Sequence, residues 1–205
     1  MKMKKITTAL AGLALSASAV LADGPVVLTA VGTWSSLTNF QKHEEPFFNT
    51  RLNAASGGDI VGKIQSQSGL GLKGFEIMRL VKNGVFDFAF GLPGYVAAEN
   101  AIFEGADLSS LTQDIDTQRK VSDAYFPTLE KAFEEIYNAK LLMLYPFPSQ
   151  TLWCNGEVNG IADLDGKKIR VYSTTLGDFV EGVGGTSVTV SFGEVIPALE
   201  KGVVD

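Results

Sequence analysis

Arg170 is the residue in this 205-residue chain whose type and position most directly suggest a chemical role. The run from Lys168 to Val171 (KIRV) predicts a short strand. Arg170 lies near its carboxyl end, where open α/β sheets place their ligands. A guanidinium offers a planar fork of donors that matches a carboxylate in two parallel hydrogen bonds. From spacing alone a second interpretation stays open, because a strand-end arginine is often solvated or paired with an acid, here Asp165 or Glu181.

The chain has too few histidines and cysteines for most catalytic or metal-binding sites. His43 is the only histidine, no G-x-S-x-G elbow occurs, and no cluster has the spacing of a zinc site. The polar run QKHEE around His43 favours an exposed helix residue. Cys154 is the only cysteine, so no internal disulfide is expected, and beside Trp153 it is interpreted as a buried small hydrophobe. The sequence therefore predicts no enzyme, no metal site and no cofactor.

The segment from Gly69 to Gly74 (GLGLKG) formally matches G-x-G-x-x-G and precedes a predicted helix over 75–82. A dinucleotide-binding fingerprint needs an acidic residue at the end of the following strand. Asp87 instead stands near the start of the predicted strand from Phe86 to Phe90. We therefore interpret the segment as a glycine turn that opens a helix, whose N-terminal amides could still attract an anion.

Strand and helix patterns alternate along the chain and predict an α/β fold. Pro46 is expected to kink or break the first helix, and Pro127 to begin a second helical piece. The prolines in residues 146–150 predict a crossover and hinge. The predicted strands are 26–31, 60–66, 86–90, 140–145, 151–155, 168–171 and 187–190, and the predicted helices are 37–56, 75–82, 116–136, 173–182 and 193–201.

The composition is that of a globular protein, with 45% hydrophobic and 20% charged residues, enough for a sizeable core in one or two domains. A net charge of -6 argues against a nucleic acid as partner.

Residues 1–22 have the pattern of a cleavable signal peptide. A short lysine-rich start precedes an apolar run over 6–21 that is short for a membrane anchor. Small residues then predict cleavage after Ala22, with Ala19 as an alternative. We expect export to the bacterial periplasm as a soluble, acidic protein.

The run DLDGKKIRV from Asp163, followed by GGTSV and by SFGEVIPALEKGVVD up to Asp205, resembles the solute receptors of the tripartite ATP-independent periplasmic (TRAP) transporters, the DctP family. Those receptors show a DLKGLKIRV-like strand with a ligand arginine, then F/P-x-E-V-Y-x-A-L-Q-x-G-x-V-D-G. The run SGLGLKGFEIMRLVKNGVFD similarly matches Q-L-G-x-x-x-E-x-x-x-x-V-x-x-G-x-x-D. The resemblance implies a two-lobed periplasmic binding protein fold (type II-like), with Arg170 as the carboxylate clamp.

The resemblance also implies a cleft with aromatic walls. The chain departs from the family pattern at two positions. No second arginine occurs near Gln150, and Ile196 replaces the usual Tyr after E-V. Glu194 is interpreted as a charge at a helix N-terminus. Trp34 and Tyr95 each keep the alternative of a packed core aromatic. The candidate ligand-binding residues are Arg170, Trp34, Tyr95, Gln150, Trp153 and Phe192.

The implied function is capture of a small organic acid and its delivery to the small and large TRAP membrane subunits, without catalysis and as a monomer. The implied organisation is a first lobe over 23–148 and the start of a second over 149–205.

GVVD is normally followed by Gly and a substantial C-terminal part, so we expect a fragment, truncated at the C-terminus. Two alternatives stay open: a ligand-sensing module for a signalling receptor, and a secreted α/β hydrolase that would depend on His43.

Overall fold

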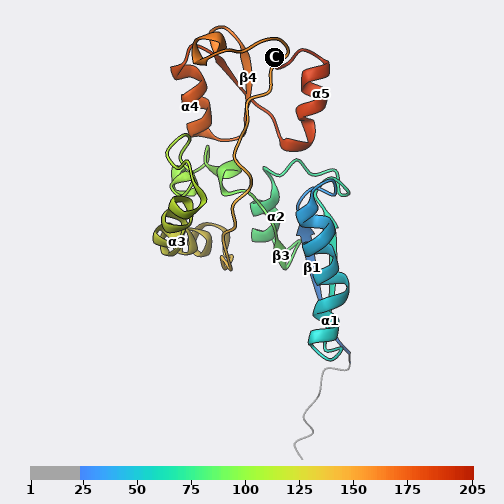
Figure 1. The fold of residues 1–205 in the computed structure, drawn as a ribbon. Coiled ribbons are helices and arrows are strands. Elements are labelled where there is room, and N and C mark those ends of the chain that lie inside the picture. Colours follow the sequence, from blue (N-terminus) through green and yellow to red (C-terminus); the bar gives the residue numbers. More distant parts are fainter. Residues whose placement is uncertain (1–23) are drawn as a thin grey trace, which may run out of the picture.

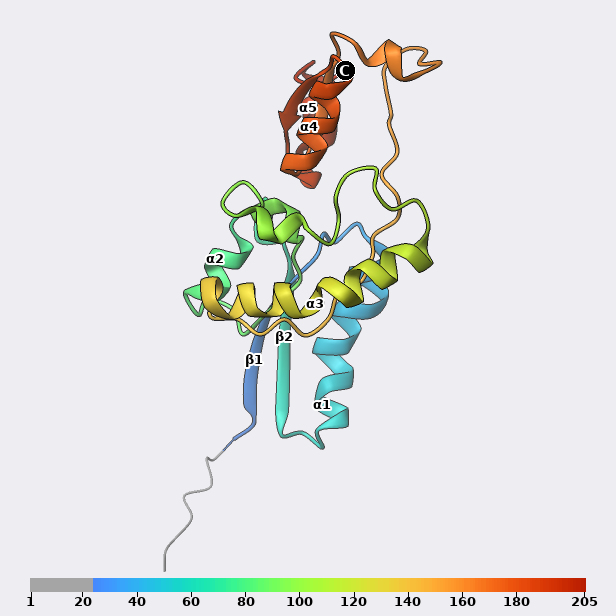
Figure 2. The same ribbon diagram turned by 90° about the vertical axis from the view of Figure 1, so that its left-hand side faces the viewer.

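The computed structural model describes residues 24–205, so the predicted signal peptide lies outside the described residues. The chain forms two separate parallel sheets. We call residues 24–137 the first lobe and residues 161–205 the second lobe. The segment between them is extended and runs from the side of the first lobe to the second, as both views show (Figures 1 and 2). The predicted boundary at 148/149 falls in this segment. The architecture is α/β, as predicted.

The sheet of the first lobe has the order β2-β1-β3, with all strands parallel. Strand β1 pairs with β2 along its whole length, and the short β3 pairs only with the end of β1. Successive residues of a strand face opposite sides. Ala30 accordingly packs on one layer of helices and Val31 on another. The strands are β1 (Val26–Gly32), β2 (Ile60–Ser66) and β3 (Phe88–Ala89).

A helical run over residues 38–55 covers the Ala30 face of the sheet. Phe40 and Phe48 from this run are buried against Ala30 and Ile64. The run continues past Pro46, which lies between wide π-helical turns instead of ending the helix. Its parts are η1 (Phe40–Glu44), η2 (Phe47–Arg51) and α1 (Leu52–Ala55).

The opposite face is covered by α2 (Ile77–Lys82) and α3 (Ile115–Tyr137), which enclose the largest core cluster. The prediction that Pro127 begins a separate helix was wrong, because α3 runs through it without a break. Proline removes one hydrogen bond from a helix interior. Burial of one face of α3, including Leu129 and Phe133, keeps the helix continuous across that loss.

The glycine turn before α2 is confirmed. Gly71 and Gly74 have φ values of 69° and 103°, a left-handed region that glycine adopts without steric cost. A Cβ on Gly74 would lie 2.5 Å from the Tyr95 ring, so the close approach of that ring also requires glycine.

The second lobe is a smaller parallel sheet with helices packed beside it. Strand β4 lies where the sequence predicts it, β5 begins one residue earlier than predicted, and the two helices fall within their predicted ranges. The buried cluster of this lobe is centred on Leu164, Ile169, Val171 and Val180. The elements are η5 (Ile161–Leu164), β4 (Lys168–Val171), α4 (Thr174–Gly182), β5 (Thr186–Thr189), η6 (Phe192–Glu194) and α5 (Val195–Glu200).

Two predicted strands, 140–145 and 151–155, are wrong, because neither range forms a strand. Residues 140–145 were predicted to be buried, yet Leu142 and Met143 are 65% and 63% exposed. Leu141 and Leu144 pack on the first core, so the segment lies along the lobe without a neighbouring strand to pair with. Cys154, predicted to be buried, is only half-buried in this linking segment.

Candidate ligand-binding site

Arg170 lies on β4 with its side chain held against the residue that follows β5. Its Nε donates a hydrogen bond to the carbonyl oxygen of Val190 at 2.9 Å. The guanidinium is half-buried, and within residues 24–205 no carboxylate forms an ion pair with it. Neither Asp165 nor Glu181, the two acids that a structural interpretation suggested, pairs with it. The site therefore presents a cation that the described part of the chain does not neutralise.

Two tyrosines surround the guanidinium. The central carbon of the Arg170 guanidinium lies 5.2 Å from the centre of the Tyr172 ring, within the range of a cation–π contact. The Tyr172 hydroxyl donates to Asp107 Oδ2 of the first lobe at 3.3 Å. The Tyr95 and Tyr172 rings are 6.0 Å apart. The Arg170 side chain is thus held by a hydrogen bond within the second lobe. Tyr172, whose ring it contacts, is hydrogen-bonded to the first lobe.

Burial dominates the electrostatics of this group. Burial lowers the pKa of Arg170 from its usual value, although the nearby Tyr95 and Tyr172 oppose the shift. Burial also raises the pKa of Tyr95 and Tyr172, and Asp107 raises that of Tyr172 further. Both phenols are therefore neutral at physiological pH, and Arg170 stays charged because an arginine pKa starts far above 7.

An aromatic cluster joins the two lobes beside Arg170. The rings of Trp34 and Phe192 are 4.9 Å apart, and Trp34 meets the Tyr95 ring at 6.3 Å in an edge-to-face arrangement. The backbone N–H of Phe192 donates to the Tyr95 hydroxyl at 3.0 Å. Trp34 is the second residue after β1 and Arg170 is on β4, so residues from the carboxyl-end regions of both sheets meet here.

The structure brings four of the six predicted site residues together and leaves two outside. Arg170, Tyr95, Trp34 and Phe192 form one group of neighbours, whereas Gln150 and Trp153 lie in the linking segment. Trp153 is 81% exposed.

Two residues of the cluster were missed by sequence analysis. Tyr172 stands two residues after Arg170, a spacing that puts both side chains on one face of an extended segment and could have identified it. Gln67, which is completely buried just after β2, has a side-chain Nε2 that donates to the Phe90 carbonyl at 3.0 Å. A lone glutamine beside a glycine-rich turn gives no comparable signal.

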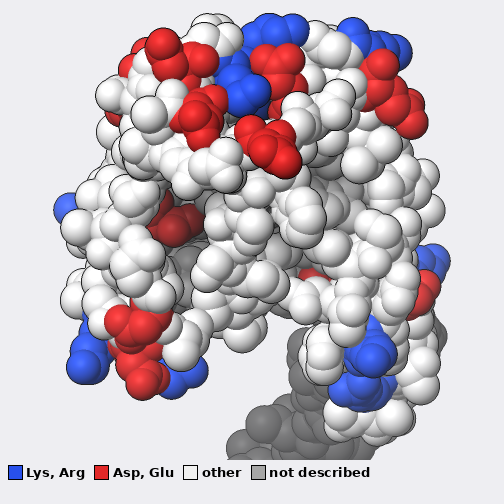
Figure 3. Space-filling model, turned by 45° about the horizontal axis from the view of Figure 1, so that its top comes forward, with Lys and Arg blue, Asp and Glu red and all other residues white. Residues whose placement is uncertain are grey.

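The face of the molecule seen from the second lobe carries no single sign of charge. Figure 3 shows basic and acidic side chains interspersed over the upper face, and a hollow below them bordered mainly by uncharged residues.

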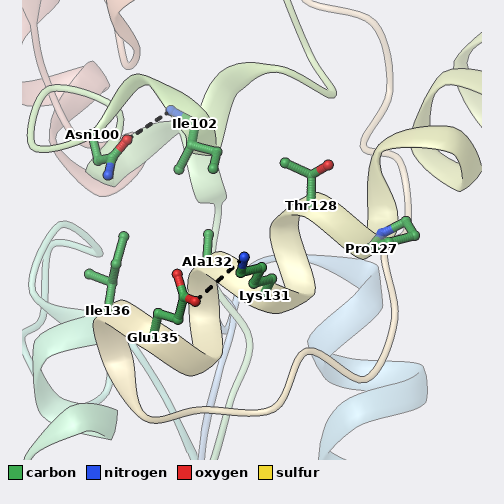
Figure 4. Close-up of a pocket in the computed structure, with 8 residues that line it drawn as sticks. All are labelled: Asn100, Ile102, Pro127, Thr128, Lys131, Ala132, Glu135 and Ile136. Carbon is green, nitrogen blue, oxygen red and sulfur yellow. Dashed lines mark hydrogen bonds and ion pairs between the residues drawn. The ribbon is translucent and has the colours of Figure 1, made fainter.

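A separate groove lies in the first lobe, between η4 (Ala101–Glu104) and α3 (Figure 4). Its volume is about 470 Å³, and Lys131 and Glu135 form an ion pair of 3.7 Å on its wall. None of the predicted site residues lines it. The lining residues are Asn100, Ile102, Pro127, Thr128, Lys131, Ala132, Glu135 and Ile136.

Residues 24–205 contain no group of three or more His, Cys, Asp or Glu side chains placed to hold a metal ion. No helix in that range has both the length and the apolar character needed to span a bilayer.

Comparison with solved structures gives the same fold. The Bordetella pertussis protein DctP7, an extracytoplasmic solute receptor binding pyroglutamic acid, superposes with a TM-score of 0.78 at 27% identity. DctP6 of the same organism, also a receptor binding pyroglutamic acid, gives 0.77 at 26%. Each comparison covers 88% of this chain but 59% of the receptor, so the chain spans about three-fifths of their length.

A Pseudomonas putida TRAP solute-binding protein with bound D-glucuronate has a TM-score of 0.77 at 22% identity, covering 88% of this chain and 59% of that one, which shows the shared fold. The family model described as bacterial extracellular solute-binding protein, family 7 (DctP), matches residues 31–205. The resemblance carried by the Arg170 strand is confirmed, and this chain belongs to the DctP family of bacterial extracellular solute-binding proteins.

Proposed function

We propose that this protein is the solute receptor of a TRAP transporter and binds a small organic acid through Arg170. The observation that carries the proposal is the half-buried guanidinium of Arg170, which forms no ion pair with a carboxylate within residues 24–205. A buried cation without a counter-charge is costly, and an incoming carboxylate would relieve that cost with paired hydrogen bonds.

The ligand class follows from the same geometry. Tyr95, Trp34 and Phe192 would enclose the body of a small acid, while Arg170 holds its carboxylate. DctP6 and DctP7 bind pyroglutamic acid, a five-membered ring with one carboxylate, which supports a compact cyclic acid. Trp153 and Gln150 would contribute only if the linking segment moved toward the cleft, so their role remains a prediction.

The acid would be bound without being changed and passed to the small and large membrane subunits. Residues 1–22 would direct export to the periplasm and be cleaved off, and the mature protein would act there as a monomer. N-terminal mass spectrometry of protein from a periplasmic extract, its elution volume in gel filtration, and recovery of the bound acid unaltered would check these points.

The test of the proposed function is a thermal-shift screen with mono- and dicarboxylates, sugar acids, cyclic acids and their neutral analogues. A ligand at one hundred times its Kd stabilises the folded state by about 2.7 kcal/mol. Arg170→Ala should abolish the shifts given by acids, since loss of a buried charged partner weakens binding by about a hundredfold or more. Arg119→Ala is the matched control, because Arg119 is an exposed arginine on α3.

Acid-specific shifts that persist in Arg170→Ala would show that Arg170 is structural and would overturn the proposal. Arg170→Lys keeps the charge but removes the planar fork, so it should recover only part of the affinity. Uptake of the identified acid by cells carrying the membrane subunits should require the wild-type protein and fail with Arg170→Ala.

A further inference from the structure

Two buried polar atoms at the lobe boundary have no hydrogen-bond partner within the described residues. They are the indole Nε1–H of Trp34 and the side-chain oxygen Oε1 of Gln67. Trp34 is 3% exposed and Gln67 is 0% exposed. Leaving a buried donor or acceptor unpaired typically costs about 1–3 kcal/mol. Two such atoms therefore suggest that something else completes them.

The orientation of the Gln67 amide follows from its contacts. Its other end donates to the Phe90 carbonyl, which can only accept, so that end is the NH₂ group and the unpaired end is the oxygen. The backbone N–H of Gln67 donates to the Thr33 carbonyl at 3.0 Å, which fixes the residue at the carboxyl end of the sheet. A Cβ built on Gly74 would lie 3.0 Å from this oxygen and 2.5 Å from Tyr95 Cε2. The oxygen thus lies beside the Tyr95 ring.

The Trp34 indole lies against the second lobe. A Cβ built on Gly193 would lie 3.7 Å from Trp34 Nε1, so the start of η6 covers this edge of the indole. Phe192 packs against the same ring. An indole nitrogen can only donate. The two unpaired atoms are therefore one donor and one acceptor, both on residues close to Tyr95.

Resting on the proposed function, we propose that Trp34 and Gln67 determine which acid is bound. Trp34 Nε1–H donates to an oxygen of the ligand body, and Gln67 Oε1 accepts from a ligand N–H or O–H, while Arg170 holds the carboxylate. The chemical class is an organic acid with an amide in its ring, because an amide supplies a carbonyl acceptor and an N–H donor together. A hydrocarbon acid of the same shape would leave both atoms unpaired.

The test compares pyroglutamate with cyclopentanecarboxylate, which has the ring and carboxylate but no amide, and with 2-pyrrolidinone, which has the amide but no carboxylate. Isothermal titration of the wild-type protein should give at least a tenfold preference for pyroglutamate over cyclopentanecarboxylate, and the weakest binding for 2-pyrrolidinone. Each of Gln67→Met and Trp34→Phe should reduce that preference severalfold while changing cyclopentanecarboxylate binding less than threefold. Gln113→Met, at an exposed position outside the proposed site, should leave the preference unchanged.

Because the variants alter buried residues, a second measurement on the wild-type protein keeps the test independent of their folding. The chain has two tryptophans, so Trp153→Phe assigns the Trp34 indole N–H signal in a ¹H–¹⁵N spectrum. That signal should move downfield on addition of pyroglutamate and stay in place with cyclopentanecarboxylate.

Three outcomes would contradict the proposal in distinguishable ways. Equal, Arg170-dependent affinity for the two acids would overturn the roles of Trp34 and Gln67 and leave the proposed function standing. A preference that survives both variants would assign the selection to other residues. If no acid in the screen stabilises the wild-type protein, the proposed function fails, and this inference fails with it.

Discussion

Glu104 of the first lobe accepts two hydrogen bonds from Thr175 of the second, one from its backbone N–H and one from its hydroxyl, both at 2.9 Å. Thr175 is in the first turn of α4, whose N-cap residue Ser173 makes no side-chain cap of its own. Carboxylates stabilise helix N-termini by satisfying unpaired N–H groups and by opposing the helix dipole. A helix in one lobe is therefore capped by an acid from the other.

The first prediction is that Glu104→Ala weakens acid binding, if the lobes separate when the ligand leaves. A charge-assisted bond at a buried site contributes roughly 1.5–3 kcal/mol, which corresponds to a loss of affinity of about ten- to a hundredfold. Titration calorimetry with the acid found in the screen measures it. Glu104→Gln keeps an acceptor and should lose less affinity, and Glu135→Ala on the exposed face of α3 is the control. Unchanged affinity in Glu104→Ala would mean that this contact does not accompany closure.

The second prediction concerns the ion pair between Lys73 and Glu194, which also joins the lobes, at 2.8 Å. Both side chains are largely exposed, with 60% and 45% of their surface accessible, so water and salt screen the pair. Lys73→Met should change acid affinity by no more than a few-fold at low salt. The difference should vanish at 1 M salt, where the screening length is about 3 Å. A large effect that persists at high salt would show that Lys73 has another role.

The local features of the chain could be predicted from its sequence. The alternation around Arg170 and the glycine signals on either side predict β4 and α4 closely, because both elements bury one face within the second lobe itself. Residues 140–145 and 151–155 have equally apolar patterns but no strand beside them, and a pattern alone cannot supply a pairing partner. The prediction that a helix begins at Pro127 failed for a related reason. The packing of Phe133 and its neighbours outweighs the one hydrogen bond that proline removes.

The site was predictable only in part. Arg170, Tyr95 and Trp34 each follow or end a predicted strand, so their meeting at the carboxyl edges follows from the fold class. Gln67 and Glu104 act through contacts with residues far along the chain, Glu104 with a residue 71 positions away. No spacing rule links such pairs before the lobes are assembled.

The third prediction is that two adjacent phenylalanines differ greatly in their contribution to stability. Phe48 is 4% exposed and packs on Phe88 and Phe90, whereas Phe47 is 44% exposed. Phe48→Ala should lower the free energy of unfolding by about 3–5 kcal/mol, because it removes buried surface and leaves a cavity. Phe47→Ala, the matched control, should cost about 1 kcal/mol or less. Urea denaturation measures both, and equal losses would contradict the placement of the helical run on the sheet.

The fourth prediction concerns acid stability and Asp87, the residue whose position spoke against a dinucleotide site. Asp87 Oδ2 accepts from the backbone N–H of Thr29 at 2.7 Å and from its hydroxyl at 2.8 Å. These bonds, the backbone one first, hold the pKa of Asp87 below its ordinary value of 3.8. They connect the start of β3 to β1, so the ionised carboxylate helps to fix the register of the sheet.

The sign of the pH effect follows from this lowered pKa. A carboxyl group with a depressed pKa in the folded state adds stability above the pKa of the unfolded chain, and that stability is lost as the pH falls through the folded-state pKa. Asp87→Asn keeps an acceptor for Thr29 but cannot titrate. The wild-type protein should therefore be the more stable of the two at pH 6, and its advantage should shrink steadily below about pH 4.

Urea midpoints of both proteins between pH 6 and pH 2.5 measure this difference directly. Asp123→Asn, which removes an exposed carboxylate from α3, corrects for the change in net charge. A constant difference between wild type and Asp87→Asn across the range would mean that Asp87 contributes only its geometry to the β1–β3 pairing. A difference that grows on acidification would contradict the lowered pKa, because the folded state would then bind the proton more tightly than the unfolded chain.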